Sequence, residues 1–360
     1  MKKIKLLVLL CSILVSLNAM ALGDEGHKTV GAIADRLIKG SNADAQVKAL
    51  LLSGESLESA SVWADCVKGS YCGPQSSEMI AYALQNPVHS TYHYTNLPVQ
   101  NIAYEMDGVG TTEHDIVRTL KQCIAVLQGN DTDASNPQHF SPRQALLLIA
   151  HLVGDIHQPL HVGAAYINKD MQFVTPANKQ QVDGINIFDL QGGNNLLIED
   201  KNTWTKRDLE AFKRDEELAK TSAAPGASAD VDKTKRIGKP LHLYWDVTVV
   251  ENVMRNLKVS SVAELTDKIM AEKPEVNINL GNAIGWPEQW ASASLVNAKF
   301  AYRDVVATDK IKITNRKGIE YSAWYGRLPA NYIEKSTEIT RTELGNAGYH
   351  LAALLMKIWP

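Results

Sequence analysis

The chain has 360 residues, of which 45% are hydrophobic, so it can bury a large core in one large domain or two. Its 37 lysines and arginines nearly balance 40 aspartates and glutamates. This balance argues against non-specific binding to duplex nucleic acid, which needs a basic surface, but it does not exclude an enzyme whose metal ions supply positive charge locally.

The first 21 residues have the three parts of a secretory signal peptide. Three early lysines form a positive start, residues 6–17 are apolar, and Ala19-Met20-Ala21 is a small-x-small cleavage site. The apolar stretch is too short to span a bilayer comfortably. We therefore expect an exported protein, secreted or periplasmic, whose mature chain begins at Leu22 and has no stable membrane association.

Most of the mature chain shows the apolar periodicity of helices. The predicted helices are Lys28–Ile38, Asp44–Leu52, Thr112–Leu127, Pro142–Ile156, Leu241–Leu257, Val262–Met270, Gln289–Val306 and Glu343–Ile358. Alternating patterns are few, and the short strand candidates are Val276–Leu280 and Ile311–Thr314. No internal repeat is visible, so we expect a mostly α protein with one multi-helix domain over residues 22–360.

Two polar stretches interrupt this pattern. Residues 165–195 are rich in Gln and Asn and predict a long loop or a small hairpin, whereas residues 221–235, rich in Ala, Ser, Gly and Asp, predict a surface excursion.

Export also permits disulfides, and Cys66 with Cys72 can close a small loop. Cys123 lies in an apolar run and is expected to be a buried thiol, although the odd cysteine count leaves the pairing open.

The segment 141–161, SPRQALLLIAHLVGDIHQPLH, combines an apolar helix with polar groups that need partners. Its Ser-Pro start is typical of a helix N-terminus, and residues 145–150 are apolar on every side, which predicts a buried helix. His151 and Asp155 lie four residues apart on one face, and His161 follows a proline that ends or kinks the helix. Because unpaired buried polar groups are costly, the pattern indicates a bound metal.

Other segments offer the missing ligands. His242 and Asp246 repeat the i, i+4 spacing at the start of a second helix, Asp65 ends an apolar patch, His93 lies between two tyrosines, and His27 opens the first helix. Each alone also fits a helix end or a packed histidine. Two His/Asp pairs on apolar helices favour a metal, and imidazole with carboxylate suits zinc.

Taken in order, the motifs LGxxGH, SxWAD, YHY, HLVGDxxQPLH, GGN and LHxxWD resemble the S1/P1 family of zinc-dependent nucleases. The resemblance implies a mostly α fold of the zinc phospholipase C type and three zinc ions. The implied ligands of the three ions are, in turn, Asp65, His93, His151 and Asp155; the amine and carbonyl of Leu22, with His27 and the bridging Asp155; and His161, His242 and Asp246. The family normally has Trp where this chain has Leu22, which can supply the same amine and carbonyl.

The activity implied by the resemblance is cleavage of single-stranded DNA and RNA to 5′-phosphorylated products, with 3′-nucleotidase activity, by a zinc-activated hydroxide. Asp65 and Asp155 are the implied catalytic carboxylates. Lys68 matches a basic residue that faces the phosphate, with an ordinary surface lysine as the other interpretation. Asn96 matches a position where fungal members have an acid that holds this basic residue, and a neutral Asn can still hydrogen-bond Lys68.

Two further positions match the family's contacts with the base. Tyr94 stands where the family stacks a base, with core packing as the competing interpretation. Asn194 matches the Asn of GGN, with Asn195 as an alternative. Two enlargements, at about residues 165–191 and 200–239, flank ligands, and we expect them to form a rim over the cleft.

Two other functions remain open. Zinc phospholipases C share the fold and the ligand order, but their last helix pair resembles HxxxE, whereas His242 and Asp246 form HxxxD. A non-catalytic exported zinc-binding protein is the second alternative, although the bridging Asp155 argues for catalysis.

We expect the protein to be a monomer. We also expect His157 to point away from the ligand face, and the remaining histidines to lie at the surface or to cap helices, namely His89, His114, His139 and His350.

Overall fold

The computed structural model describes residues 22–360, apart from 71, 207, 211, 212, 214–237, 275, 277, 278 and 315–318. The predicted signal peptide and the predicted excursion at 221–235 lie outside the described residues. Within the described part of the chain, no helix has the length and apolar character needed to cross a membrane.

The structure is mostly helical, as predicted. The α-helices are α1 (Gly23–Ile38), α2 (Asn42–Leu50), α3 (Leu57–Ala60), α4 (Trp63–Cys66), α5 (Ser77–Gln85), α6 (Ile116–Leu127), α7 (Pro142–His157), α9 (Leu241–Leu243), α10 (Val249–Leu257), α11 (Val262–Ala271), α12 (Trp286–Tyr302) and α13 (Tyr332–Ile358). Short 3₁₀ turns include η1 (His89–His93), η2 (Pro159–His161) and η4 (Gln191–Gly193), and a π-helical turn, η6 (Tyr244–Thr248), joins α9 to α10.

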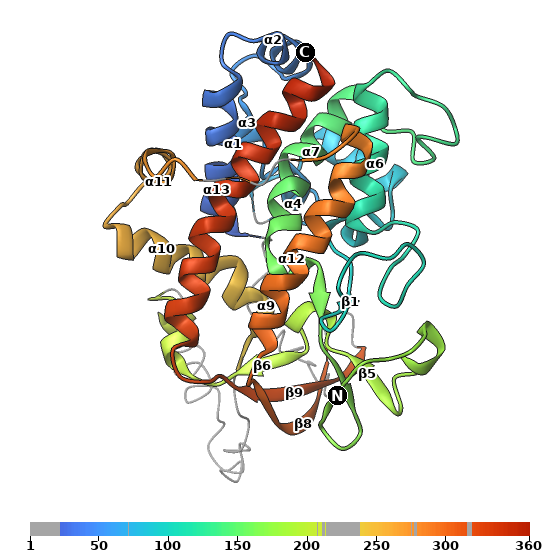
Figure 1. Cartoon of the computed structure of the whole chain (residues 1–360), viewed down its shortest axis with the longest axis vertical. Helices are drawn as coiled ribbons and strands as arrows, with labels where there is room; N and C mark the ends of the chain where they lie inside the picture. Colours follow the sequence, from blue (N-terminus) through green and yellow to red (C-terminus); the bar gives the residue numbers. More distant parts are fainter. Residues whose placement is uncertain are drawn as a thin grey trace, which may run out of the picture.

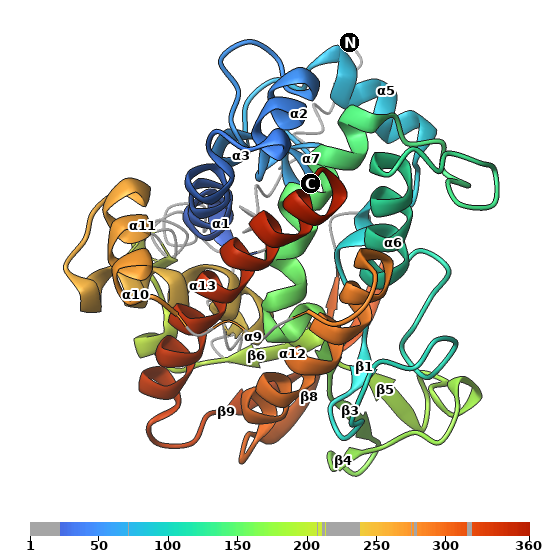
Figure 2. The same ribbon diagram turned by 45° about the horizontal axis from the view of Figure 1, so that its top comes forward.

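Helix α7 is the central helix of the molecule. Its first turn is fixed by a capping box, in which the Ser141 side chain accepts from the Gln144 amide and the Gln144 side chain accepts from the Ser141 amide. Every residue from Ala145 to His157 is buried. Helices α1, α6, α12 and α13 pack around it (Figures 1 and 2). A helix that is apolar on all sides requires such complete enclosure.

The strands form three small sheets, and the two larger ones lie toward the bottom of Figure 1. The largest has the order β7-β6-β9-β8, from strands Lys239–Pro240, Leu196–Ile198, Glu320–Arg327 and Val306–Thr314. The second, β4-β3-β5, is antiparallel and is built from Phe173–Val174, Tyr166–Asn168 and Ile187–Asp189. Strands β1 (Leu97–Pro98) and β2 (Gly163–Ala164) pair in parallel. The polar stretch 165–195 therefore contains the predicted hairpin, with a third strand added.

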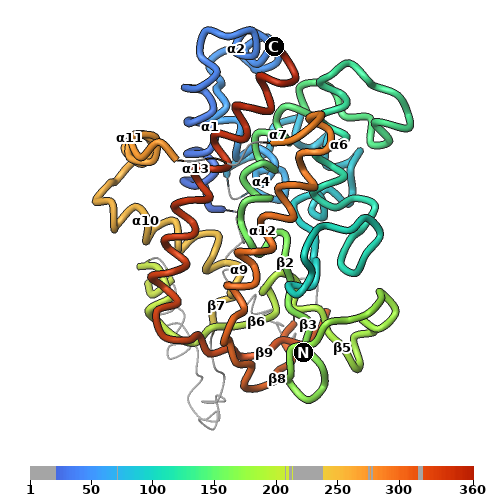
Figure 3. Tube along the Cα trace, viewed as in Figure 1, coloured from blue at the N-terminus to red at the C-terminus, as the bar shows by residue number. Residues whose placement is uncertain are grey.

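Helix α13 connects the two ends of the molecule. The Tyr332 hydroxyl at its start accepts from Trp245 Nε1 at 2.9 Å and donates to the Ala301 carbonyl. Its far end lies beside α2, where Asn42 Nδ2 donates to the Pro360 carbonyl (Figure 3). The Trp245–Tyr332 contact fixes the position of the α9–η6 segment against α13.

Several boundaries differ from the prediction. Helix α13 begins at Tyr332 rather than at 343, because its first half buries small polar residues such as Ser336 and Thr340, which give no apolar period. Helix α12 ends at Tyr302, and Leu241–Leu257 is interrupted by the π-helical turn. The predicted strand Ile311–Thr314 is part of β8, whereas the described residues of Val276–Leu280 form no strand.

The cysteine and histidine predictions have mixed outcomes. Cys66 and Cys72, whose pairing the sequence left open, form a disulfide, and Cys123 is a buried thiol, as expected. His157 points away from the ligand face, but the surface or capping role predicted for His350 is wrong. His350 is buried, and its Nδ1 lies 2.7 Å from His157 Nε2, because two turns of different helices meet there beside Trp290.

Candidate metal centre

The predicted ligands come from seven separate elements and meet in one buried place. Helix α7 carries His151 and Asp155, the start of α1 carries Leu22 and His27, and short helical segments carry the rest. All are at most 6% exposed. Three groups have ligand atoms within 4.8 Å of one another, namely His27, His151 and Asp155; Asp65, His93 and His151; and His161, His242 and Asp246.

Asp155 lies between histidines on both sides. Its Oδ2 atom is 2.9 Å from His93 Nδ1 and 3.1 Å from His151 Nε2. Its Oδ1 atom is 3.2 Å from His27 Nε2. The two oxygens therefore face different partners, which is the arrangement that a bridging carboxylate needs.

A second cluster surrounds Asp246. Its Oδ1 atom is 3.4 Å from His161 Nε2, and its Oδ2 atom is 3.4 Å from His242 Nε2. Oδ1 also accepts from Gln158 Nε2 at 2.7 Å and from the Leu22 backbone nitrogen at 3.2 Å. The Leu22 nitrogen thus lies at the edge of the cluster, against Asp246.

Backbone carbonyls orient three of the imidazoles. The Nδ1 atoms of His151, His161 and His242 lie 2.6, 2.8 and 2.9 Å from the carbonyls of Ser61, His93 and Gly192. When Nδ1–H donates to a carbonyl, the Nε2 lone pair is free to bind a metal. Each of these Nε2 atoms faces Asp155 or Asp246.

Two glycines make this packing possible. A Cβ on Gly154 would lie 2.8 Å from His27 Nδ1, so the absence of a side chain lets the His27 ring lie against α7. Gly192 has φ 57°, and a Cβ there would lie 2.3 Å from the Leu160 carbonyl oxygen and 3.3 Å from His242 Nδ1. The glycine of the GGN motif is therefore needed for the carbonyl that orients His242.

Several polar atoms of the centre have no hydrogen-bond partner among the described residues. They are both ring nitrogens of His27, Oδ1 of Asp155, Nε2 of His161 and Oδ2 of Asp246. A buried polar atom without a partner costs about 1–3 kcal/mol, so such a concentration is expensive. Nitrogen and carboxylate oxygen donors in this arrangement suit zinc, and the residues present fit a metal centre.

The histidines of the centre fall into two groups, one with a lowered pKa and one with a raised pKa. Burial lowers the pKa of His27 and His242, and with the help of Lys68 it lowers the pKa of His93 to about 3. These imidazoles are neutral, which is the form that binds metals. Burial also acts to lower the pKa of His161, but Asp155 and Asp246 raise it to about 9. A metal held by His161 would displace this proton.

The predicted substrate-binding residues around the centre differ in their exposure and in their hydrogen-bond partners. Lys68 Nζ is 2.6 Å from Asp65 Oδ1, so it is an ion-pair partner of a predicted ligand rather than an ordinary surface lysine. Tyr94 is 37% exposed, whereas Tyr92 is buried. Asn96, which by sequence could hydrogen-bond Lys68, donates through Nδ2 to Asp189 Oδ2 at 2.8 Å.

The GGN asparagines also differ from each other. Asn194 is partly exposed, and its Nδ2 donates to the Gln191 carbonyl, whereas Asn195 is buried. Two residues that complete the site had no role in the sequence prediction. Gln158 lies in the QPLH context and could have been found there, but Asp189 sits in the polar stretch with no motif around it.

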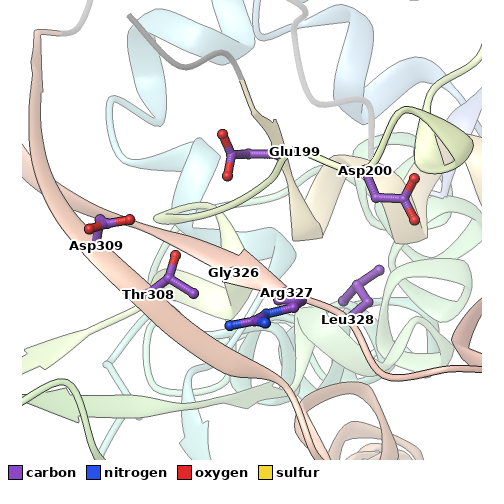
Figure 4. Close-up of a pocket in the computed structure, with 7 residues that line it drawn as sticks. All are labelled: Glu199, Asp200, Thr308, Asp309, Gly326, Arg327 and Leu328. Atoms are coloured by element: carbon purple, nitrogen blue, oxygen red, sulfur yellow. The ribbon is translucent and has the colours of Figure 1, made fainter. Parts of the chain in front are cut away.

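A separate cavity of about 540 Å³ lies elsewhere, between the ends of β6, β8 and β9. It is lined by Glu199, Asp200, Thr308, Asp309, Gly326, Arg327 and Leu328 (Figure 4). None of these residues belongs to the centre.

Comparison with known proteins identifies similar chains. Residues 22–203 match the family model described as S1/P1 Nuclease. The chain is 23% identical to Endonuclease 2 of Arabidopsis thaliana, over 95% of this chain and 92% of that protein, and 23% identical to Endonuclease 4 of the same plant, over 95% and 90%. It is 29% identical to Endonuclease 5, over 41% of this chain and 47% of that protein.

Proposed function

The chain belongs to the S1/P1 nuclease family and is a nuclease, and from this premise we propose that it is exported, depends on zinc and cleaves single-stranded DNA and RNA. We further propose that its products carry 5′-phosphates and that it removes phosphate from 3′-nucleotides. The observation that carries the proposal is the convergence of buried imidazoles and carboxylates, several of whose facing atoms have no hydrogen-bond partner in the described chain.

The proposed metal ligands are those that the resemblance implies. Asp65, His93, His151 and Asp155 would hold one zinc ion; Leu22, His27 and Asp155 a second; and His161, His242 and Asp246 a third. Zinc supplies Lewis-acid charge for the phosphoryl oxygens and makes water a stronger nucleophile at neutral pH.

The chain's own residues would orient and polarise the substrate. Lys68 is partly exposed and paired with Asp65, so its ammonium group can face a phosphate while Asp65 keeps it in place. Lys68, His151 and His93 lower the pKa of Asp65 against the effect of burial, which keeps this carboxylate ionised. The exposed Tyr94 ring offers a surface on which a base can stack. Such stacking requires an unpaired base, which favours single strands.

Removal of the signal peptide would complete the second zinc site. Leu22 is buried, and its nitrogen lies at the edge of the centre, 3.2 Å from Asp246 Oδ1. Only cleavage before Leu22 turns this nitrogen into an amine that can bind a metal. Export and full metal loading are therefore coupled in this proposal.

Zinc counting on the mature protein, together with assays on single- and double-stranded DNA and RNA, tests the proposal. We expect three zinc ions per chain and faster cleavage of the single-stranded substrates, with 5′-phosphate ends. Fewer than three ions alongside full activity would refute the three-ion centre. Equal rates on duplex and single-stranded substrates would refute the strand preference.

Two assays separate the alternatives. Hydrolysis of phosphatidylcholine without release of nucleotides would identify a phospholipase C, and bound zinc without phosphodiesterase turnover would identify a zinc-binding protein. The match to a nuclease family and the HxxxD pair at His242 and Asp246 favour the nuclease.

A further inference from the structure

A carboxylate from the 165–195 hairpin lies beside the predicted base-stacking position. Asp189 ends strand β5, and its Oδ2 atom accepts from Asn96 Nδ2 at 2.8 Å. Its Oδ1 atom accepts from the Gln191 backbone nitrogen at 2.6 Å. Both oxygens are therefore held in place by one donor each.

Asn96 is itself held by its own backbone. Its nitrogen donates to the Gly110 carbonyl, and its carbonyl accepts from the Tyr166 hydroxyl at 2.6 Å. Asn96 is only 9% exposed, so its amide group has little freedom. A rigid amide that donates to Asp189 keeps the carboxylate plane fixed.

Asp189 has no cationic partner among the ion pairs of the described residues, although it is largely enclosed. Burial raises its pKa to about 6, against the lowering effect of the Gln191 and Asn96 hydrogen bonds. A carboxylate with a raised pKa beside a predicted site is a candidate for a functional role.

The same carboxylate contacts the segment that contains Tyr94. Asn96, whose Nδ2 atom donates to Asp189 Oδ2 at 2.8 Å, follows Tyr94 by two residues. Tyr94 and Asn96 are separated by one residue in the same segment. Asp189 is followed by the turn that contains Gly192. Asp189 is therefore bound to the segment that carries the ring on which a base would stack.

A fixed carboxylate presents two adjacent acceptors. Each oxygen of Asp189 uses one lone pair for its present donor and keeps another. Guanine offers two adjacent donors, N1–H and N2–H, on its Watson–Crick edge. Adenine and cytosine offer one donor next to an acceptor, and thymine and uracil place N3–H between two carbonyls. Unpaired bases are read on these edges in single strands.

We propose that Asp189, positioned by Asn96, accepts hydrogen bonds from the Watson–Crick edge of the base on Tyr94 and makes the enzyme prefer guanine. The proposal rests on the proposed nuclease function. It gives the hairpin insertion a role in base specificity. The insertion supplies the carboxylate of Asp189 next to Asn96, at whose position fungal members of the family have an acid.

The test uses zinc-loaded mature protein and single-stranded 12-mers of thymidine with one central guanine or one central adenine. Both purines stack well, so the ratio of cuts beside guanine to cuts beside adenine isolates the hydrogen-bond contribution. A bidentate pair of this kind is expected to give a ratio of roughly 10. Asp189→Asn exchanges one acceptor for a donor in the same shape and should bring the ratio close to one, with zinc content unchanged.

Two further variants complete the test. Asp170→Asn makes the same chemical change at an exposed turn of the same sheet and should leave the ratio as in the parent. Asn96→Ala leaves the carboxylate but removes the donor that holds it, so the ratio should fall while zinc stays bound. An unchanged ratio in both Asp189→Asn and Asn96→Ala, or an equal loss of cutting at every base, would overturn the proposal.

The outcomes also separate this inference from the proposed function. If the zinc-loaded parent protein cleaves none of the oligonucleotides, the proposed function fails. If the parent cleaves them without favouring guanine over adenine, only the role of Asp189 fails.

Discussion

The imidazole rings of His27 and His151 stack with their centroids 3.8 Å apart and their planes 15° apart. The two histidines belong to α1 and α7, and each also faces Asp155. This close approach is possible because Gly154, next to Asp155 on α7, has no side chain.

Gly154→Ala is therefore expected to displace His27. The added Cβ would lie 2.8 Å from His27 Nδ1 and 3.1 Å from Cε1, and overpacking of this kind costs about 1–3 kcal/mol. We expect lower zinc content, measured by mass spectrometry, together with reduced activity. Gly285→Ala, where an added Cβ meets no atom within 4 Å, is the matched control. Full zinc content in Gly154→Ala would show that His27 is not a ligand.

Asp155→Asn is expected to cost more activity than the loss of any single histidine of the centre. Its two oxygens face His27 on one side and His93 with His151 on the other, so this one change affects both groups of ligands. The measurement is kcat/KM for Asp155→Asn beside His27→Ala, His151→Ala and His161→Ala. A histidine variant with the greater loss would contradict the bridging role.

Removal of zinc is expected to destabilise the fold without unfolding it. Without zinc, the atoms of His27, Asp155, His161 and Asp246 that have no hydrogen-bond partner in the described chain also lack a metal to bind. The hydrophobic core around α7 does not depend on these atoms. An ion present at 1,000 times its dissociation constant stabilises a protein by about 4 kcal/mol. Calorimetry with a chelator should show a lower Tm that recovers when zinc is added back. An unchanged Tm would argue against a metal in this centre.

Glu343→Gln is expected to stabilise the protein at alkaline pH. Burial raises the pKa of Glu343 to about 7, and the hydrogen bonds that Asn346 and Asn297 donate to Oε1 offset this only in part. The folded state thus favours the protonated acid. This contribution to stability is complete below the ordinary value of 4.5 and is lost as the pH rises through about 7. Glutamine keeps the Oε1 acceptor and carries no charge.

The expected gain in the free energy of unfolding is roughly 1–3 kcal/mol at pH 8, and it should shrink toward pH 5. Denaturant unfolding at both pH values measures it. Glu338→Gln, at an exposed position of the same helix, should show no such gain. A gain for Glu343→Gln that is equal at both pH values would contradict the role of its ionisation.

The sequence alone was sufficient for the helical architecture and for the residues that meet in the centre. The helices depend on local properties of the sequence, namely the amphipathic period and the capping signals. The i, i+4 spacing of His151 with Asp155 and of His242 with Asp246 is also local, because it places both residues of each pair on one helix face. The order of the motifs also supplied the family, which the comparison confirmed.

Other features depend on contacts between distant segments, and only the tertiary structure decided them. Strand β6 pairs with β9 more than a hundred residues later, and the buried pair of His157 and His350 joins two helices. Asp189 meets Asn96 across 93 residues. Such contacts carry no periodic signal, because the energy that selects them comes from packing and hydrogen bonding between side chains that are neighbours only after the chain has folded.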